Sequence, residues 1–74
     1  MKIKNLNGET ILEIDGKTLA GANLSGKVLI RADLRNLNLI STNFKNADLY
    51  GADFRGADLT FANLTNANLN QAFF

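Results

Sequence analysis

An apolar residue recurs at every fifth position of this chain from residue 14 to residue 74. The series has no gap or insertion and runs through Ile14, Leu19, Leu24, Leu29, Leu34, Leu39, Phe44, Leu49, Phe54, Leu59, Leu64, Leu69 and Phe74. An α-helix advances by a net angle of about 140° over five residues, so these side chains would scatter around its cylinder. On a strand, side chains alternate between faces with period two, so an odd spacing would divide the series between both faces. Neither element gives these residues one common face.

A chain that turns a corner about every five residues does bury all of them together. Each segment then forms one side of a square coil with its central apolar residue inward, and about twenty residues complete four sides. Successive coils would stack at the usual strand spacing of about 4.8 Å, and a fixed period of this kind indicates a solenoid. Residues just past the centres would lie at corners, where Gly and Asn tolerate turn backbone angles. These corner residues are Gly16, Gly21, Gly26, Asn36, Asn46, Gly51, Gly56 and Asn66.

The repeat itself has a recognisable composition. Within NADLYGADFRGADLTFANLTNANL, residues 46–69, Ala stands two positions before each centre and Asp or Asn stands directly before it. This Ala-(Asp/Asn)-Leu-X-X pattern resembles the pentapeptide-repeat family, and the resemblance covers residues 12–74. It implies an all-β fold, a right-handed quadrilateral parallel β-helix of about three coils. The right-handedness follows from the resemblance alone.

Two positions depart from the pattern. Lys17 and Lys27 stand where the inward-facing small residue is expected. A buried unpaired Lys is costly, so we expect both side chains to reach solvent from a distorted first coil.

Residues twenty apart should stack in columns on the outside as well. Asn23, Asn43 and Asn63 share one column and could form an amide ladder, or Asn could simply be tolerated beside a corner. A second face carries four charges, at Asp33, Arg35, Asp53 and Arg55. We interpret it as a solvated face with ion pairs between coils, each worth about 0–1 kcal/mol.

The first thirteen residues predict a β-hairpin that caps the open end of the solenoid. Open coil ends expose strand edges and core, and Asn7-Gly8 is a strong hairpin signal. The expected pairs across a two-residue turn are Ile3 with Leu12, Met1 with Ile14, and Lys2 with Glu13. The sequence therefore predicts a single domain, with a hairpin cap over residues 1–13 and a β-helix over residues 14–74.

The other end of the repeat has no comparable cap. Phe74 is a centre, and Phe73 stands where other repeats carry Asp or Asn. Two chains could stack here about a two-fold axis, the end could be solvated, or the chain could be cut from a longer one. We favour a homodimer because an isologous contact extends the core and hides both edges. Its expected centre is Phe73 and Phe74, together with Phe54.

Composition argues against an enzyme. The chain has no Cys and no His, which removes thiol chemistry, the commonest general base and the commonest metal ligands. Ser25 and Ser41 therefore have no imidazole to activate them. No Gly-rich phosphate loop is present, and a core filled by Leu, Phe and Ala leaves no ligand pocket. We predict no catalytic residue, cofactor or metal.

Outward apolar residues indicate a candidate partner surface. Val28, Ile30 and Tyr50 project from one face, and Ile40 and Phe61 project from the opposite face. Exposed apolar patches often mark contacts, but single exposed apolar residues are common, and Phe61 could simply cover a corner. We take Val28, Ile30 and Tyr50 as the candidate partner patch.

These features favour a non-enzymatic scaffold or protein-interaction module. Some members of the resembled family mimic duplex DNA and modulate type II topoisomerases such as gyrase, which a supercoiling assay would detect. That alternative implies a long acidic rod, whereas this chain is short and carries a net charge of +2 from Lys17 onward. Direct nucleic-acid binding is also disfavoured, since the positive charges are scattered and no aromatic stripe accompanies them. The start lacks a signal-peptide pattern and no segment reaches membrane-spanning length, so we expect a cytoplasmic protein.

Overall fold

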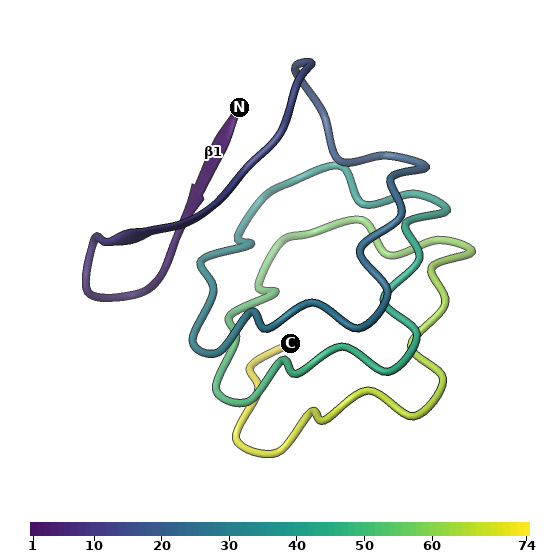
Figure 1. Cartoon of the computed structure of the whole chain (residues 1–74). Helices are drawn as coiled ribbons and strands as arrows, with labels where there is room; N and C mark the ends of the chain where they lie inside the picture. The colour runs from purple at the N-terminus through teal and green to yellow at the C-terminus, as the bar shows by residue number, and fades with distance from the viewer.

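The computed structural model describes residues 1–74 and contains strands but no helix. Two strands, β1 (Lys2–Lys4) and β2 (Thr10–Glu13), form an antiparallel pair. The rest of the chain consists of short extended segments joined by turns, and successive loops of similar outline lie over one another (Figure 1). The molecule measures 27 × 26 × 22 Å along its principal axes. The prediction of a strand-only fold is confirmed.

Segments twenty residues apart pair in parallel, as the repeat predicts. The parallel bridges are Asn23 with Asn43, Val28 with Asp48, Asp33 with Asp53, Asn38 with Asp58, Asn43 with Asn63, Asp48 with Asn68, and Asp53 with Phe73. We therefore divide the chain into layer 1 (residues 18–37), layer 2 (residues 38–57) and layer 3 (residues 58–74). The layers are joined by backbone hydrogen bonds such as that from the Leu24 N–H to the Asn43 oxygen, at 2.7 Å.

Each corner contains one residue with positive φ. From residue 16 onward the positions recur every five residues: Gly16, Gly21, Gly26, Arg31, Asn36, Ser41, Asn46, Gly51, Gly56, Phe61, Asn66 and Gln71. A turn hydrogen bond closes most corners, for example from the Ala47 N–H to the Phe44 oxygen at 2.9 Å. The predicted Gly and Asn corners are confirmed. Arg31, Ser41, Phe61 and Gln71 occupy the same conformation without the residue type that favours it.

The Asp or Asn before each centre closes a local turn. Its Oδ1 accepts a hydrogen bond from the backbone N–H two residues later, as in Asx-turns. This bond forms at Asn23, Asp33, Asn38, Asn43, Asp48, Asp53, Asp58, Asn63 and Asn68. Thr18 uses its hydroxyl in the same way. Val28 and Phe73 have no side-chain acceptor and form no such turn.

The Asn column forms only part of the ladder considered from the sequence. One amide contact joins adjacent layers, from Asn43 Nδ2 to Asn23 Oδ1, at a long 3.4 Å. No amide bond joins Asn43 to Asn63. The Oδ1 of each Asn accepts the backbone N–H of its own turn, and Asn23 Oδ1 accepts the Asn43 amide as well, so one contact of the ladder forms.

The apolar centres of layers 1 and 2 form the core. The fully or almost fully buried centres are Leu19, Leu24, Leu29, Leu34, Leu39, Phe44, Leu49 and Phe54. Thr42 occupies one of the small inward positions, where its hydroxyl donates to the Leu19 oxygen at 2.8 Å. Lys17 and Lys27 are exposed, as expected. In layer 3, by contrast, Leu59, Leu64 and Leu69 are only partly buried.

The hairpin forms, but its loop differs from the expectation. The Asn5 N–H donates to the Glu9 oxygen and the Gly8 N–H to the Asn5 oxygen, so three residues rather than two form the loop. Asn5 Oδ1 stabilises it by accepting the Asn7 and Glu9 N–H groups, each at 3.0 Å. Gly8 adopts a φ of 86°, which suits glycine at the end of such a loop.

A bulge restores the predicted register beyond this loop. The ladder pairs Lys4 with Thr10 but Ile3 with Leu12, which leaves Ile11 without an opposite residue. The extra residue compensates for the longer loop. As a result the predicted pair of Lys2 with Glu13 forms, and so does the pair of Met1 with Ile14, through the Ile14 N–H and the Met1 oxygen at 3.0 Å.

The hairpin lies to one side of the stacked loops (Figure 1). It docks on layer 1 through an antiparallel contact. Asn5 bridges Ala32, the Leu6 N–H donates to the Arg31 oxygen at 2.8 Å, and Ile3 is buried. The Asp33 N–H donates to the oxygen of Lys4, within β1. The twenty-residue repeat predicts that the segment at Ile14 stacks on the segment at Leu34, and this prediction is wrong because β1 occupies that edge.

Candidate interaction surfaces

The candidate partner patch lies on adjacent layers of one face. Val28 is 66%, Ile30 41% and Tyr50 43% exposed. Tyr50 lies directly across the layer contact from Ile30, since the next N–H, of Arg31, donates to the Tyr50 oxygen at 2.6 Å. The structure thus brings Ile30 and Tyr50 together, with Val28 bridged to Asp48 beside them.

Phe73 and Phe74 are exposed on layer 3, at 49% and 66%. The Phe73 backbone continues the stack, because its N–H donates to the Ala52 oxygen at 2.9 Å. The Arg55 guanidinium lies 5.3 Å from the centre of the Phe73 ring, within cation–π range. The Phe74 ring stacks nearly parallel on Phe54, with 5.2 Å between ring centres.

Phe54 does not reach the surface. It is 2% exposed and contacts Phe44 edge-to-face, with 6.0 Å between ring centres. A direct role for Phe54 at an interface is therefore not compatible with its position. Phe54 instead supports Phe74 from within the core.

Layer 3 presents an open strand edge. In layer 2, the N–H groups of Leu39, Phe44 and Leu49 donate to layer 3 at 2.8–2.9 Å. The equivalent N–H groups of layer 3, on Leu59, Leu64 and Leu69, have no acceptor in the chain. Unpaired strand edges of this kind can pair with another chain, and here they coincide with partly exposed core residues.

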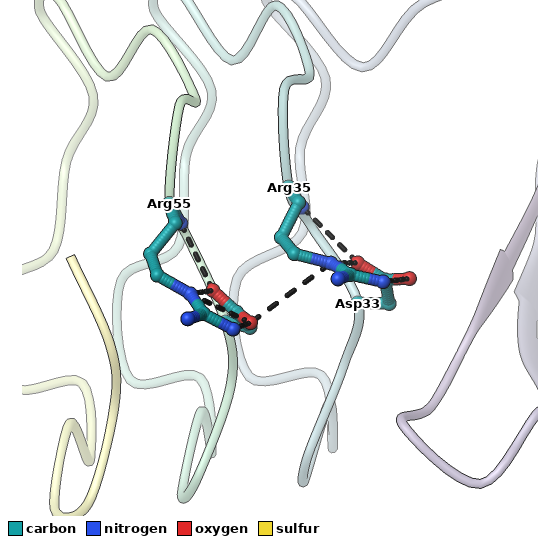
Figure 2. A network of polar contacts seen from close by, with 4 residues as sticks. Asp33, Arg35 and Arg55 are labelled. Carbon is teal, nitrogen blue, oxygen red and sulfur yellow. Dashed lines mark hydrogen bonds and ion pairs between the residues drawn. The ribbon is translucent and has the colours of Figure 1, made fainter.

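A second face carries the charged cluster (Figure 2). Arg35 donates to both carboxylate oxygens of Asp33 at 2.8–2.9 Å, and Arg55 makes the same two-point contact with Asp53. The prediction of ion pairs between layers is mostly wrong, since only Arg35 Nε reaches across, to Asp53 at 3.9 Å. The side chains two residues apart lie close enough to pair within one layer.

Asp53 is buried, and the two arginines of the charged cluster lower the pKa of its carboxyl group. Hydrogen bonds from the Arg55 side chain and backbone, with the charges of Arg55 and Arg35, outweigh burial and lower the pKa of Asp53 to about 2. The Arg35 side chain likewise lowers the pKa of Asp33, and the Thr60 hydroxyl lowers that of Asp58. The carboxylates of Asp33 and Asp53 thus accept hydrogen bonds from the arginine side chains and from the backbone N–H groups of their own turns.

Phe61 lies at a corner of layer 3, which is one of the two interpretations that its sequence position allowed. It is 86% exposed and adopts a φ of 59°, unusual for a bulky residue. Its five-residue spacing from Gly56 and Asn66 was the signal for this conformation. Ile40, one layer away, is half-buried.

No pocket is present in the structure. No group of three or more His, Cys, Asp or Glu side chains is arranged to hold a metal ion. None of the chain forms a helix with the length and apolar character needed to cross a membrane.

The sequence matches the family model described as pentapeptide repeats (8 copies), over residues 18–49 and 38–74. The chain belongs to the pentapeptide-repeat family. The match spans layers 1 to 3 and leaves out the hairpin. Pentapeptide-repeat proteins generally form a β-helix and serve as structural or interaction modules rather than enzymes. A search of curated proteins found no similar sequence.

Proposed function

We propose that this pentapeptide-repeat protein is a non-enzymatic scaffold that binds other proteins through its surface. In this proposal the three layers, residues 18–74, are three coils of a right-handed quadrilateral β-helix, and the hairpin over residues 1–13 caps them. Parallel bridges twenty residues apart and a corner every five residues support this architecture.

The observation that carries the proposal is the open edge of layer 3. Unpaired N–H groups on Leu59, Leu64 and Leu69 lie beside partly exposed core residues and the exposed rings of Phe73 and Phe74. A second copy related by a two-fold axis would cover edge and core together, since an isologous contact joins identical surfaces. We therefore infer a homodimer through layer 3, with Phe73 and Phe74 at its centre.

The patch of Val28, Ile30 and Tyr50 is a second binding surface in this proposal. It lies mainly on layer 1, and so would stay accessible when two copies meet through layer 3. A dimer would then present two such patches, one from each chain. Bivalent presentation strengthens binding to a partner that can reach both patches.

Mass in solution tests the pairing. The wild-type chain and a Phe73→Asp, Phe74→Asp variant are compared by sedimentation over a concentration series. We expect a dimer for the wild type and a monomer for the variant, because four carboxylates would be buried at the contact. Circular dichroism checks that the variant keeps the fold. A monomer for both chains would contradict the proposed dimer.

A further inference from the structure

The Val28–Ile30 stretch of layer 1 is an open strand edge, as are the stretches at Thr18 and Asn23 before it, whereas the segment after it is covered by the hairpin. The backbone N–H and C=O groups of Val28 and Ile30 form no hydrogen bond within the chain. The equivalent groups in layer 2, on Asp48 and Tyr50, are all bonded. Asp48 donates to the Lys27 oxygen at 2.9 Å and accepts from the Leu29 N–H at 2.7 Å. Tyr50 donates to Asp48 Oδ1 at 3.2 Å and accepts from Arg31.

The hairpin stops just short of this edge. β1 and its loop cover the neighbouring segment through the bonds of Leu6 to Arg31 and of Asp33 to Lys4. Val28 and Ile30 lie on the other side of the corner at Arg31, beyond the reach of those bonds. The uncovered edge is thus a short extended segment with donors and acceptors available on one side.

Val28 also breaks the local rule of the repeat. At the equivalent position, nine other repeats carry Asp or Asn and cap the N–H two residues later. Val28 cannot, so the Ile30 N–H is left free and two apolar side chains stand outward instead. A local departure without a structural gain is typical of a functional position.

The charged residues beside the Val28–Ile30 edge indicate which kind of segment could bind there. Lys27 and Arg31 flank the edge, both are exposed, and neither forms an ion pair. The nearest carboxylate along this column, Asp48, is already engaged by the Tyr50 N–H and by Asn68 Nδ2. An acidic segment is therefore complementary to this edge. Two copies of this chain are not, because antiparallel pairing would bring both pairs of cations together.

We propose that the Val28–Ile30 edge accepts an extended acidic segment of a partner protein as an added β-strand. The partner's backbone bonds the free groups of Val28 and Ile30, as in β-strand addition generally. Its outward apolar side chains lie beside Val28 and Ile30 with period two, and its flanking carboxylates pair with Lys27 and Arg31. This inference rests on the proposed function, because it assigns a ligand to a lateral surface of the same interaction module.

The test uses a phage-displayed library of random peptides of about ten residues, longer than a typical strand of about 5–6 residues. The immobilised wild-type protein is the bait, and recovered peptides are resynthesised for fluorescence anisotropy. We expect peptides with acidic residues flanking two apolar residues spaced by one. N-methylation of their central amides is expected to abolish binding, since a methylated amide cannot donate to the edge.

The decisive variant is Val28→Asn, which gives the position the residue that the repeat normally carries. Asn fits above Asp48, because Asn68 contacts Asp48 in the same way from the other side. It would cap the Ile30 N–H and remove one apolar side chain, so the fold is retained while binding weakens by about tenfold or more. Lys27→Glu with Arg31→Glu is expected to weaken binding similarly. Phe61→Ser, which removes an exposed ring elsewhere, is the matched control and should bind like the wild type.

Recovery of no peptide, recovery of basic peptides, or equal binding to Val28→Asn would overturn the proposal. Sedimentation of the same variants separates this outcome from failure of the proposed function. Val28→Asn is expected to remain a dimer. If no peptide binds but the protein still forms a dimer, the edge proposal is wrong and the scaffold proposal is unaffected. If the wild type is a monomer, the proposed dimer is wrong and the edge proposal is unaffected.

Discussion

At the scale of single residues, the fold depends on corners that require a positive φ every five residues. Gly56 is the most constrained of the glycines, because a Cβ there would lie 2.1 Å from Asn36 Oδ1 as well as at a φ of +76°. Gly26 has a similar φ of +68° but no atom within 4 Å of the added Cβ. A side chain at Gly26 would therefore meet backbone strain alone, whereas a side chain at Gly56 would meet backbone strain and a steric clash.

We predict that Gly56→Ala lowers the free energy of unfolding more than Gly26→Ala does. Each substitution carries a backbone penalty of about 1–2 kcal/mol, and Gly56→Ala must also displace the Asn36 side chain. Urea denaturation measures both. In an Asn36→Gly background, Gly56→Ala should cost no more than Gly26→Ala. Equal costs in the wild-type background would contradict the steric argument.

A second prediction at this scale concerns pH. The folded-state pKa of Asp53 is about 2, below its usual 3.8, so folding favours the carboxylate. The stabilisation is therefore complete above about pH 4 and is lost as the pH falls from about 4 to about 2. Asp53→Asn keeps an acceptor for the local turn but has no charge to titrate. Its melting temperature should fall less than that of the wild type between these pH values, and parallel curves would contradict the assignment.

At the scale of elements, the hairpin is the part of the fold where the repeat gives no guidance. The pairs of Ile3 with Leu12 and of Lys2 with Glu13 match the register predicted from Asn7-Gly8, but only because the bulge at Ile11 compensates for the longer loop. The three-residue loop could not be predicted, because it depends on the Asn5 side chain binding two N–H groups at once. Docking at Ala32 could not be predicted either, because an antiparallel contact does not follow the twenty-residue spacing of the repeat.

The hairpin is expected to act as a cap through Ile3, which is buried against the core. Ile3→Ala should lower the free energy of unfolding by about 2–4 kcal/mol, the usual cost of emptying a core position. Lys2→Ala removes only an exposed ion pair with Glu13 at 3.7 Å and should cost less than about 1 kcal/mol. Thermal or urea unfolding compares the two. Similar, small effects would show that the hairpin contributes little to the core.

At the scale of the whole molecule, the repeat determined most of what could be predicted. One inward residue in five specified the stacked pairs, the corners and the core through layer 2. For the predicted surfaces, the repeat indicated only which side chains point outward. Whether their backbone groups are hydrogen-bonded could not be predicted, because this depends on which edges the hairpin covers: β1 covers Ala32, and nothing in the chain covers Val28. The burial of Phe54 beneath Phe74 could not be predicted from the repeat either.

We infer that layer 3 is the pairing surface of an interaction scaffold, and amide hydrogen exchange tests this claim at the residues concerned. Exchange is measured by NMR at protein concentrations below and above the midpoint of association. The N–H groups of Leu39, Phe44 and Leu49 are bonded within the chain and should exchange slowly at both concentrations. Those of Leu59, Leu64 and Leu69 should exchange rapidly when dilute and become protected when concentrated. Rapid exchange of the layer 3 groups at both concentrations would contradict the claim.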